Sequence, residues 1–222
     1  MSTDLSRERA RLYLITPPQI SDIPGFVDQF RAAIAGGDIA SLQIRIKNQG
    51  ELDPVATRQV ALAVQPLCRA NQIALIINDS PHLCLAVEAD GVHLGDQDMD
   101  IPAARRLIGD DLIIGATCRN SRHVAMLAGE AGADYLAFGA FHPSRTKVDT
   151  TPADPGILTW CQMFLTLPCV AIGGVDVTNA KTLVAAGADF IAASSGVWDY
   201  ADGPAAAVNR FNQVIDQAMA GE

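Results

Sequence analysis

Short apolar runs alternate with amphipathic stretches along almost the whole chain. The amphipathic or Ala-rich stretches often begin at Asp, Ser or Thr and end at Gly, as helices commonly do. The apolar runs are rich in β-branched residues and predict eight strands, at residues 12–16, 41–47, 73–78, 91–95, 112–117, 135–140, 170–174 and 190–194. A further helical stretch follows the last strand. This alternation predicts parallel strands joined by crossover helices.

Eight strand-helix units in 222 residues fit a single (β/α)8 TIM barrel, which usually has roughly 250 residues. We expect one domain over residues 1–222, with its core at about 11–218. A similar turn recurs where helices give way to strands, at 88–91, 131–134 and 186–189, as expected of a repeated unit. A doubly wound open sheet is the alternative, but no Gly-x-Gly-x-x-Gly follows the first strand, as it usually does in that fold.

The composition narrows the class of protein. With 49% hydrophobic and 18% charged residues, the chain can bury a full core and is expected to be a soluble globular protein. A net charge of −9 argues against nucleic-acid binding, because most of the surface would repel a phosphate backbone. No segment reaches the roughly 18 uninterrupted apolar residues of a membrane span, so we expect no membrane partner and a cytoplasmic location. The sequence leaves a homo-oligomer open.

The five cysteines are scattered and odd in number, and no two of them form a Cys-x-x-Cys pair. They therefore predict neither a disulfide framework nor a zinc site. We expect them to be small buried hydrophobic residues.

The second predicted strand, SLQIRIK at residues 41–47, alternates apolar and polar residues. In a parallel barrel one face of each strand packs under the helices and the other lines the interior, whose open end carries active sites. The apolar residues of this strand are then expected to face the helices. The polar ones are expected to point inward, toward a ligand: Gln43, Arg45 and Lys47. The alternative is an edge strand with a solvated face.

Carboxylates follow two neighbouring predicted strands. The third strand ends Asn78-Asp79, and the fourth runs through His93 to Asp96 and Asp98. Two carboxylates leaving adjacent strands suit Mg²⁺, which typically takes one or two protein carboxylates and completes its shell with water and phosphate oxygens. The alternatives are that these aspartates are helix N-caps, which strand-to-helix loops favour, and that His93 is a packed, hydrogen-bonded histidine.

Three later strand ends carry groups that bind phosphate. The loop after the sixth strand has two hydroxyls and two cations within Ser144–Lys147. Gly173-Gly174 end the seventh strand and Ser194-Ser195 the eighth, in the loops where barrels commonly bind phosphate through backbone N–H groups. The site with cations and carboxylates suits a diphosphate, whereas the neutral site of glycines and serines suits a monophosphate. Two phosphorylated substrates are therefore predicted.

Seven short motifs follow one another at these strand ends. They are QIRIK at 43–47, IIND at 76–79, GVHLG at 91–95 followed by Asp98, IGAT at 114–117, SRTK at 144–147, AIGG at 171–174, and GAD to SS at 187–195. Each is modest alone, but the ordered set is specific. In it the chain resembles the thiamine phosphate synthase family, also called thiamine-phosphate pyrophosphorylase, from about residue 11 to residue 198.

The resemblance implies a magnesium-dependent (β/α)8 transferase of thiamine biosynthesis. Members of that family join 4-amino-5-hydroxymethyl-2-methylpyrimidine diphosphate to 4-methyl-5-(2-phosphoethyl)thiazole, which gives thiamine monophosphate and diphosphate. The diphosphate is thought to leave first, so that the thiazole nitrogen traps a pyrimidine methylene cation. These small phosphorylated molecules are the partners that the resemblance implies.

The resemblance also assigns residues to this chemistry. It implies that the diphosphate is held by Arg45, Lys47, Asn78 and Lys147. It implies that Asp79 and Asp98 bind Mg²⁺ and that Gln43 orients the pyrimidine. It implies hydrogen bonds to the reacting phosphate groups or ring substituents from Thr117, Ser144 and Thr146. It implies that the thiazole phosphate is bound by Gly173, Gly174, Ser194 and Ser195.

Several positions depart from the family pattern. Thr117 stands where Ser is common, Asp96-Gln97 reverses the usual order of Gln and an acid, and the roles of Asp96, His142 and Arg145 stay undetermined. Two alternatives in the same superfamily stay open. One is a thiazole tautomerase, although that branch carries a catalytic His where this chain has Ala140. The other is a noncatalytic protein that binds a thiazole or thiamine phosphate.

Overall fold

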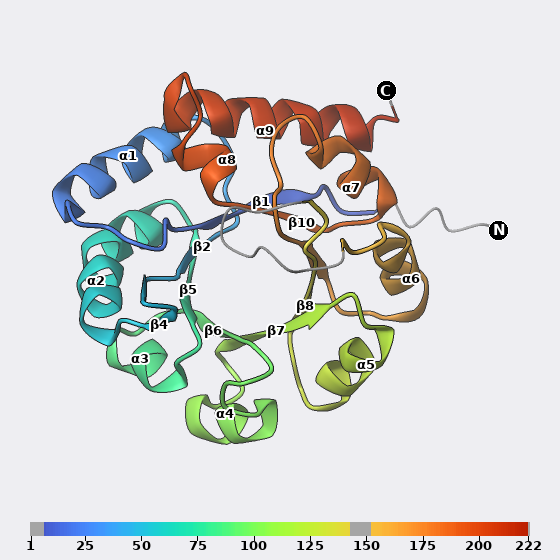
Figure 1. Ribbon diagram of the computed structural model, residues 1–222, viewed down its shortest axis with the longest axis horizontal. Helices are drawn as coiled ribbons and strands as arrows, with labels where there is room; N and C mark the ends of the chain where they lie inside the picture. Colours follow the sequence, from blue (N-terminus) through green and yellow to red (C-terminus); the bar gives the residue numbers. More distant parts are fainter. Residues whose placement is uncertain (1–6, 143–151, 222) are drawn as a thin grey trace.

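The computed structural model describes residues 7–142 and 152–221. Eight parallel strands in this part of the chain close into a barrel, in the order β1-β10-β9-β8-β7-β6-β5-β2 (Figure 1). The first strand pairs with both the last and the second, so the sheet has no free edge. The predicted (β/α)8 barrel is confirmed. Its strands are β1 (Arg11–Ile15), β2 (Ser41–Ile44), β5 (Ala74–Asn78), β6 (Gly91–Leu94), β7 (Ile113–Arg119), β8 (Tyr135–Phe138), β9 (Cys169–Ala171) and β10 (Phe190–Ala193).

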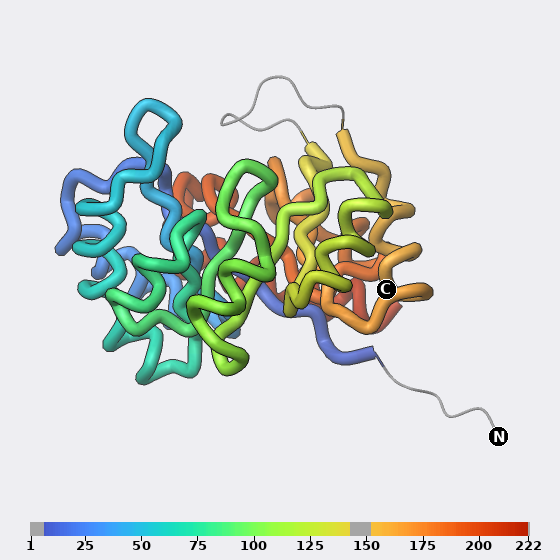
Figure 2. The backbone as a smooth tube through the Cα atoms, turned by 90° about the horizontal axis from the view of Figure 1, so that it is seen from below, coloured from blue at the N-terminus to red at the C-terminus, as the bar shows by residue number. Residues whose placement is uncertain are grey.

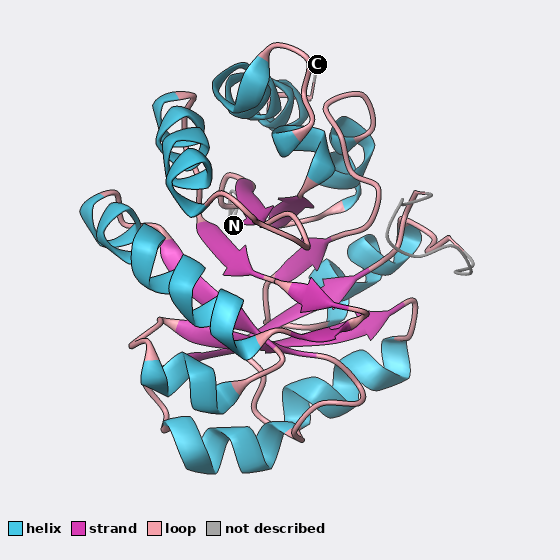
Figure 3. Ribbon diagram, turned by 60° about the vertical axis from the view of Figure 1, so that its left-hand side comes forward, coloured by secondary structure: helices cyan, strands magenta, loops and turns pink. Residues whose placement is uncertain are grey.

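Helices surround the strands on the outside of the barrel (Figure 3). They are α1 (Ile23–Ala35), α2 (Pro54–Ala70), α3 (Pro81–Ala86), α4 (Ile101–Ile108), α5 (Arg122–Glu130), α6 (Gly156–Phe164), α7 (Ala180–Ala186), α8 (Ser195–Trp198) and α9 (Gly203–Met219). Within residues 7–142 and 152–221, no helix combines the length and the apolar character that crossing a membrane requires.

Short side chains set where the first five helices begin. In each, an Asp or Ser side chain accepts a hydrogen bond from the backbone N–H three residues later, which satisfies one of the amides that a helix start leaves unpaired. The first four of these helices also have proline in the first turn, where its missing N–H costs nothing. The capping residues are Asp22, Asp53, Ser80, Asp100 and Ser121.

Alternate residues of each strand enter two separate layers. In β2, Leu42 and Ile44 join the large core that also contains helix residues, whereas Gln43 is 2% exposed and faces the barrel interior. Burying each of the two apolar side chains contributes about 1.5–3 kcal/mol. A one-residue slip of β2 would exchange its faces and is therefore strongly disfavoured. The small apolar cluster inside the barrel consists of Tyr13, Ile15, Tyr135, Ala137, Val170 and Ala192.

The predicted strand over residues 41–47 is wrong beyond Ile44. The chain leaves the barrel there and forms an antiparallel hairpin of β3 (Lys47–Asn48) and β4 (Glu51–Leu52), which protrudes from one end of the molecule (Figure 2). Prolines explain the break, because the neighbouring segment after β1 is Pro17-Pro18 and has no N–H to continue the ladder. The alternative of a solvated edge strand is also wrong, since β2 pairs with both β1 and β5.

The recurring turn between helix and strand carries a recurring hydrogen bond. Its Asp carboxylate accepts from a backbone N–H near the start of the neighbouring strand, and each of these charge-assisted bonds measures 2.7 Å. The turns lie at the amino ends of the strands, so this repeat stabilises the end of the barrel opposite the carboxyl ends of the strands. The donor and acceptor pairs are Leu75 and Asp90, Ile114 and Asp134, and Cys169 and Asp189.

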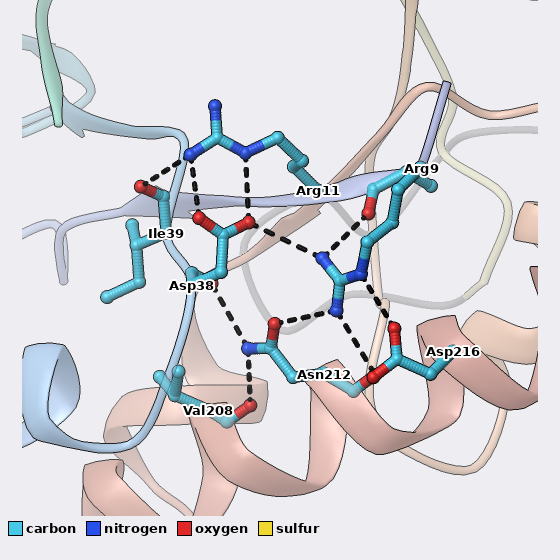
Figure 4. Close-up of polar contacts among 8 residues, drawn as sticks. Arg9, Arg11, Asp38, Ile39, Val208, Asn212 and Asp216 are labelled. Atoms are coloured by element: carbon cyan, nitrogen blue, oxygen red, sulfur yellow. Dashed lines mark hydrogen bonds and ion pairs between the residues drawn. The ribbon is translucent and has the colours of Figure 1, made fainter. Parts of the chain in front are cut away.

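A polar network ties the first strand to the last helix (Figure 4). Arg11 donates two hydrogen bonds to the Asp38 carboxylate, from Nε at 2.9 Å and from Nη2 at 2.7 Å. Arg9 donates to Asp216 at 2.6 Å and to Asn212 at 2.9 Å, and Asn212 in turn donates to the backbone carbonyl of Asp38 at 3.1 Å. The network therefore joins β1, the loop before β2 and α9, where the barrel closes.

We expect Asp38→Asn to lower the melting temperature at pH 7 by roughly 2 °C. The hydrogen bonds from Arg11 hold the pKa of Asp38 below its ordinary value. The stabilisation is thus fully present above pH about 4 and is lost as the pH falls through the lowered folded-state pKa. Calorimetric melting at several pH values tests this. Asp28→Asn, which breaks an exposed pair with Arg31, should change little, and an Asp38→Asn effect that persists unchanged in strong acid would contradict the charge-based explanation.

Candidate active site

The carboxyl ends of the eight parallel strands meet at one end of the barrel, which we call the mouth. The described residues that the sequence assigns to the site lie in or just after these strand ends. They are Gln43, Arg45, Lys47, Asn78, Asp79, Asp98, Thr117, Gly173, Gly174, Ser194 and Ser195.

A cation and two carboxylates from distant parts of the chain come together at the mouth. Lys47 of β3 donates a hydrogen bond from Nζ to Asp79, which follows β5. Burial raises the pKa of Asp98 above its ordinary value, and the charge of the neighbouring Asp79 adds to the rise, while the Gly95 N–H and the charge of Lys47 oppose it. The cluster has a net charge of −1 when all three groups are ionised. It therefore retains attraction for a cation.

The local backbone structure fixes where the Asp79 and Asp98 carboxylates lie. Asp79 has a left-handed backbone with φ of +65°, which Asp tolerates better than most residues, and its N–H donates to the His93 carbonyl at 2.8 Å. The Gly95 N–H donates to Asp98 Oδ2 at 2.7 Å and fixes the loop after β6. The helix-cap alternative is wrong for both residues, because Ser80 caps α3 and Asp100 caps α4.

Two amide side chains line the interior just below this cluster. Gln43 Nε2 donates to Asn78 Oδ1 at 3.1 Å, and both residues are buried. The Asn78 Nδ2 group is also buried, and no described residue accepts a hydrogen bond from it. Leaving such a donor unpaired costs about 1–3 kcal/mol. An acceptor atom of a bound ligand would remove that cost.

The two cations of the QIRIK motif, Arg45 and Lys47, have different surroundings. The Lys47 ammonium is paired with Asp79. Arg45 is partly buried, and its backbone N–H donates to Thr16 Oγ1 at 2.9 Å. Among the described residues, no side chain pairs with the Arg45 guanidinium. Its charge is thus available to an anion near the mouth.

Thr117 ends a chain of buried polar side chains that crosses the barrel. His93 contacts Thr117 Oγ1 through Nε2 and the Tyr135 hydroxyl through Nδ1, each at 2.9 Å, and Tyr135 contacts the Tyr13 hydroxyl at 2.9 Å. The expectation that His93 is a packed, hydrogen-bonded histidine is confirmed. Neither tyrosine belongs to the sequence motifs. The available signal was their position at inward-facing places of strands β1 and β8.

The glycines after β9 expose their backbone. Gly173 and Gly174 have φ of +97° and +64°, and a Cβ on Gly173 would lie 2.4 Å from the Ala140 side chain. Neither N–H donates to another backbone group in the described chain. Ser195 and Gly196 open α8, so their amides have no intrahelical acceptor. These amides suit a phosphate, whereas the Ser194 hydroxyl donates to the Thr16 carbonyl at 3.2 Å.

The loop after β8 carries predictions that the structure leaves untested, since Ser144, Arg145, Thr146 and Lys147 lie outside the described residues. His142, just before them, donates its N–H to the Gly173 carbonyl at 3.1 Å. Its Nε2 is buried and has no partner among the described residues. The loops after β8 and β9 are therefore in contact at the mouth.

Asp96 is paired with an arginine from a neighbouring strand. Arg119 at the end of β7 donates from Nη2 to both carboxylate oxygens of Asp96, each at 2.8 Å. Arg119 belongs to none of the sequence motifs.

All five cysteines are buried and form no disulfide with one another, and burial raises the pKa of Cys84 to about 11. They are the buried hydrophobic residues that the sequence predicted, and Cys84 is no thiolate nucleophile at neutral pH.

Comparison with known proteins gives matches that span almost the whole chain. A profile of the family described as thiamine monophosphate synthase matches residues 12–197. The chain is 53% identical over 211 residues to thiamine-phosphate synthase of Hyphomonas neptunium, covering 95% of this chain and 96% of that protein. It is 51% identical over 205 residues to that of Rhodospirillum centenum, covering 92% and 97%. Thiamine phosphate pyrophosphorylase from Pyrococcus furiosus has a TM-score of 0.80 at 31% identity, over 94% of this chain and 96% of that one.

Proposed function

Since this chain belongs to the thiamine monophosphate synthase family, we propose that it joins the diphosphate of 4-amino-5-hydroxymethyl-2-methylpyrimidine to 4-methyl-5-(2-phosphoethyl)thiazole. The products are thiamine monophosphate and diphosphate. The observation that carries this proposal is the convergence of Lys47, Asp79 and Asp98 at the mouth of the barrel. Such a cluster suits a polyanion bound together with a divalent cation.

The first step breaks the bond between the pyrimidine methylene carbon and the diphosphate oxygen, and the electron pair leaves with the diphosphate. Negative charge therefore grows on the leaving oxygen, and fixed positive charge nearby lowers the barrier. Lys47 and Arg45 supply it, Lys147 adds to it, and the unpaired Asn78 amide donates a hydrogen bond. The thiazole nitrogen then forms the new bond to the methylene carbon.

Asp79 and Asp98 fit Mg²⁺ as its protein ligands. No group of three or more His, Cys, Asp or Glu side chains within residues 7–142 and 152–221 is arranged to hold a metal ion, so this part of the chain offers no set of three or four protein ligands of the kind that zinc takes. Two carboxylates match the usual Mg²⁺ site, which takes its remaining ligands from water and substrate phosphates. When bound, the ion neutralises charge on the diphosphate oxygens.

The remaining residues position the two substrates. Gln43 lies in the barrel interior, where its side chain donates to Asn78. Its amide orients the pyrimidine ring there. Thr117, Ser144 and Thr146 donate to phosphate oxygens or ring substituents. The backbone amides at Gly173-Gly174 and Ser194-Ser195 hold the phosphate of the thiazole, helped by the start of α8.

A single incubation tests the proposed reaction. The purified protein is mixed with both phosphorylated precursors, with and without Mg²⁺, and thiamine monophosphate and diphosphate are quantified over time. We expect equal amounts of the two products, formed only when the metal is present. Binding of the thiazole phosphate without turnover would contradict the proposal and favour a binding protein, and isomerisation of the thiazole would favour a tautomerase.

A further inference from the structure

We propose that His93, Tyr135 and Tyr13 are positioning residues that keep the Thr117 hydroxyl proton directed into the mouth of the barrel. The inference rests on the proposed function, in which Thr117 donates to the substrate. His93 lies in one of the sequence motifs, where it is expected only to pack and form hydrogen bonds. Neither tyrosine lies in any motif. The four side chains come from strands β6, β8, β1 and β7, so only the closed barrel brings them together.

The chain of contacts is continuous and shielded from water. Three hydrogen bonds, each 2.9 Å long, link Tyr13 to Tyr135, Tyr135 to His93 Nδ1, and His93 Nε2 to Thr117. Tyr13, Tyr135 and His93 are 5%, 7% and 8% exposed. The two tyrosines belong to the apolar cluster inside the barrel. In such surroundings a donor without an acceptor is costly, so the protons take the arrangement that pairs every donor.

Only one direction of the protons satisfies Tyr13. Each hydroxyl has one proton, and a neutral imidazole has one N–H and one acceptor nitrogen. In the described chain the Tyr13 hydroxyl hydrogen-bonds to Tyr135 alone, so Tyr13 must donate to Tyr135. Tyr135 then donates to His93 Nδ1, and His93 donates from Nε2 to Thr117. The Thr117 proton is left to point away from His93.

The barrel holds the Tyr135 ring in the one place that completes this chain. The His93 and Tyr135 rings stack with centroids 5.6 Å apart and an angle of 22° between their planes. Gly115, beside His93 on the neighbouring strand, makes room for the phenol, because a Cβ there would lie 1.9 Å from Tyr135 Cζ. Burial also raises the pKa of both phenols, so both hydroxyls keep their protons.

The direction of the chain matters because a threonine hydroxyl can either donate or accept. A leaving diphosphate is an acceptor, so a hydroxyl that offers it a proton stabilises the transition state, whereas one that offers a lone pair repels it. His93 thus acts on the substrate through Thr117.

Nitrogen NMR of protein labelled in its four histidines tests the direction of the protons. We expect the buried His93 to carry its proton on Nε2, with Nδ1 accepting a hydrogen bond. The signal is assigned by its loss in His93→Leu. A wild-type His93 protonated on Nδ1 would overturn the proposal, because Thr117 would then donate to the histidine and not to the substrate.

A double-mutant cycle tests the action through Thr117. We expect Thr117→Val to lower kcat/KM by about tenfold or more. His93→Leu is combined with Tyr135→Phe and Tyr13→Phe, because removing all three linked groups avoids leaving an unpaired buried group. This combination should lower kcat/KM similarly, and adding Thr117→Val to it should produce no further loss, since all of these changes remove the directed hydrogen bond from Thr117 to the substrate.

The controls separate the possible failures. Tyr200→Phe, the same change at the one tyrosine outside the chain of contacts, should leave kcat/KM unchanged, and His93→Gln should keep most activity, because an amide can accept from Tyr135 and donate to Thr117. Loss of activity that adds to that of Thr117→Val would overturn the positioning role while leaving the proposed function intact. Full activity of Thr117→Val would overturn both the positioning role and the assignment of Thr117, and absence of turnover in the wild type would overturn the proposed function itself.

Discussion

Replacing Asp98 by asparagine is expected to lower kcat/KM by about a hundredfold or more. Asparagine has the same shape, and its side-chain oxygen still accepts the hydrogen bond that Gly95 now donates to Asp98 Oδ2, so the loop keeps its structure. The substitution removes one negative charge. Lys47 then neutralises the remaining carboxylate of Asp79, and the cluster has no net charge left to attract a divalent cation.

Calorimetric titration with Mg²⁺ in the presence of diphosphate measures this loss without relying on turnover. Wild-type protein should bind the pair together, and Asp98→Asn should bind it far more weakly. Asp100→Asn is the matched control, because it makes the same substitution two residues away, where the side chain caps α4 and asparagine caps equally well. Unchanged Mg²⁺ binding by Asp98→Asn would remove Asp98 from the metal site.

Replacing Gly115 by alanine is expected to destabilise the protein by about 2 kcal/mol or more, which corresponds to a fall in melting temperature of roughly 4–8 °C. A Cβ at this position would lie 1.9 Å from Tyr135 Cζ and 2.2 Å from its hydroxyl oxygen. The ring cannot move freely, since it is enclosed by the barrel and stacks on His93. Activity should fall as well, because a displaced Tyr135 breaks the contacts that reach Thr117.

The control for this substitution is Gly129→Ala on helix α5. There the new Cβ meets only the end of the Leu167 side chain at 3.2 Å, and alanine favours a helix by about 1 kcal/mol over glycine. Thermal melting should therefore show an unchanged or higher melting temperature for Gly129→Ala and a lower one for Gly115→Ala. A Gly115→Ala protein that melts within about 1 °C of wild type would show that the barrel interior repacks freely.

Several features of the site can be predicted from the sequence, because they depend on short stretches of chain. Apolar residues that recur with the period of a strand predict its existence, and a parallel barrel places every strand end at one mouth, so the sequence predicts that Asp79 and Asp98 lie near each other. The proximity of Lys47 to Asp79 followed for the same reason. Lys47 does contact Asp79, even though the strand predicted to contain Lys47 ends at Ile44.

The end of β2 and the choice of helix caps cannot be predicted from the sequence. Alternation of apolar and polar residues continues through Lys47, but β2 ends at Ile44, beside the Pro17-Pro18 segment, which has no N–H to extend the ladder. The aspartates after β5 and β6 also fit helix caps by residue type. Which Asp or Ser caps a helix depends on where the backbone turns, and the turns place Ser80 and Asp100 there.

The amino-acid sequence by itself determined the class of fold, the order of strands and helices, and the kinds of groups at each strand end, because periodicity, caps and turns act over a few residues. Only the tertiary structure decided which of these groups touch. The contacts of Tyr13 with Tyr135 and of Asp38 with Asn212 join residues more than a hundred positions apart. Such pairs form because closing the barrel fixes the register of every strand at once, and no local pattern encodes that closure.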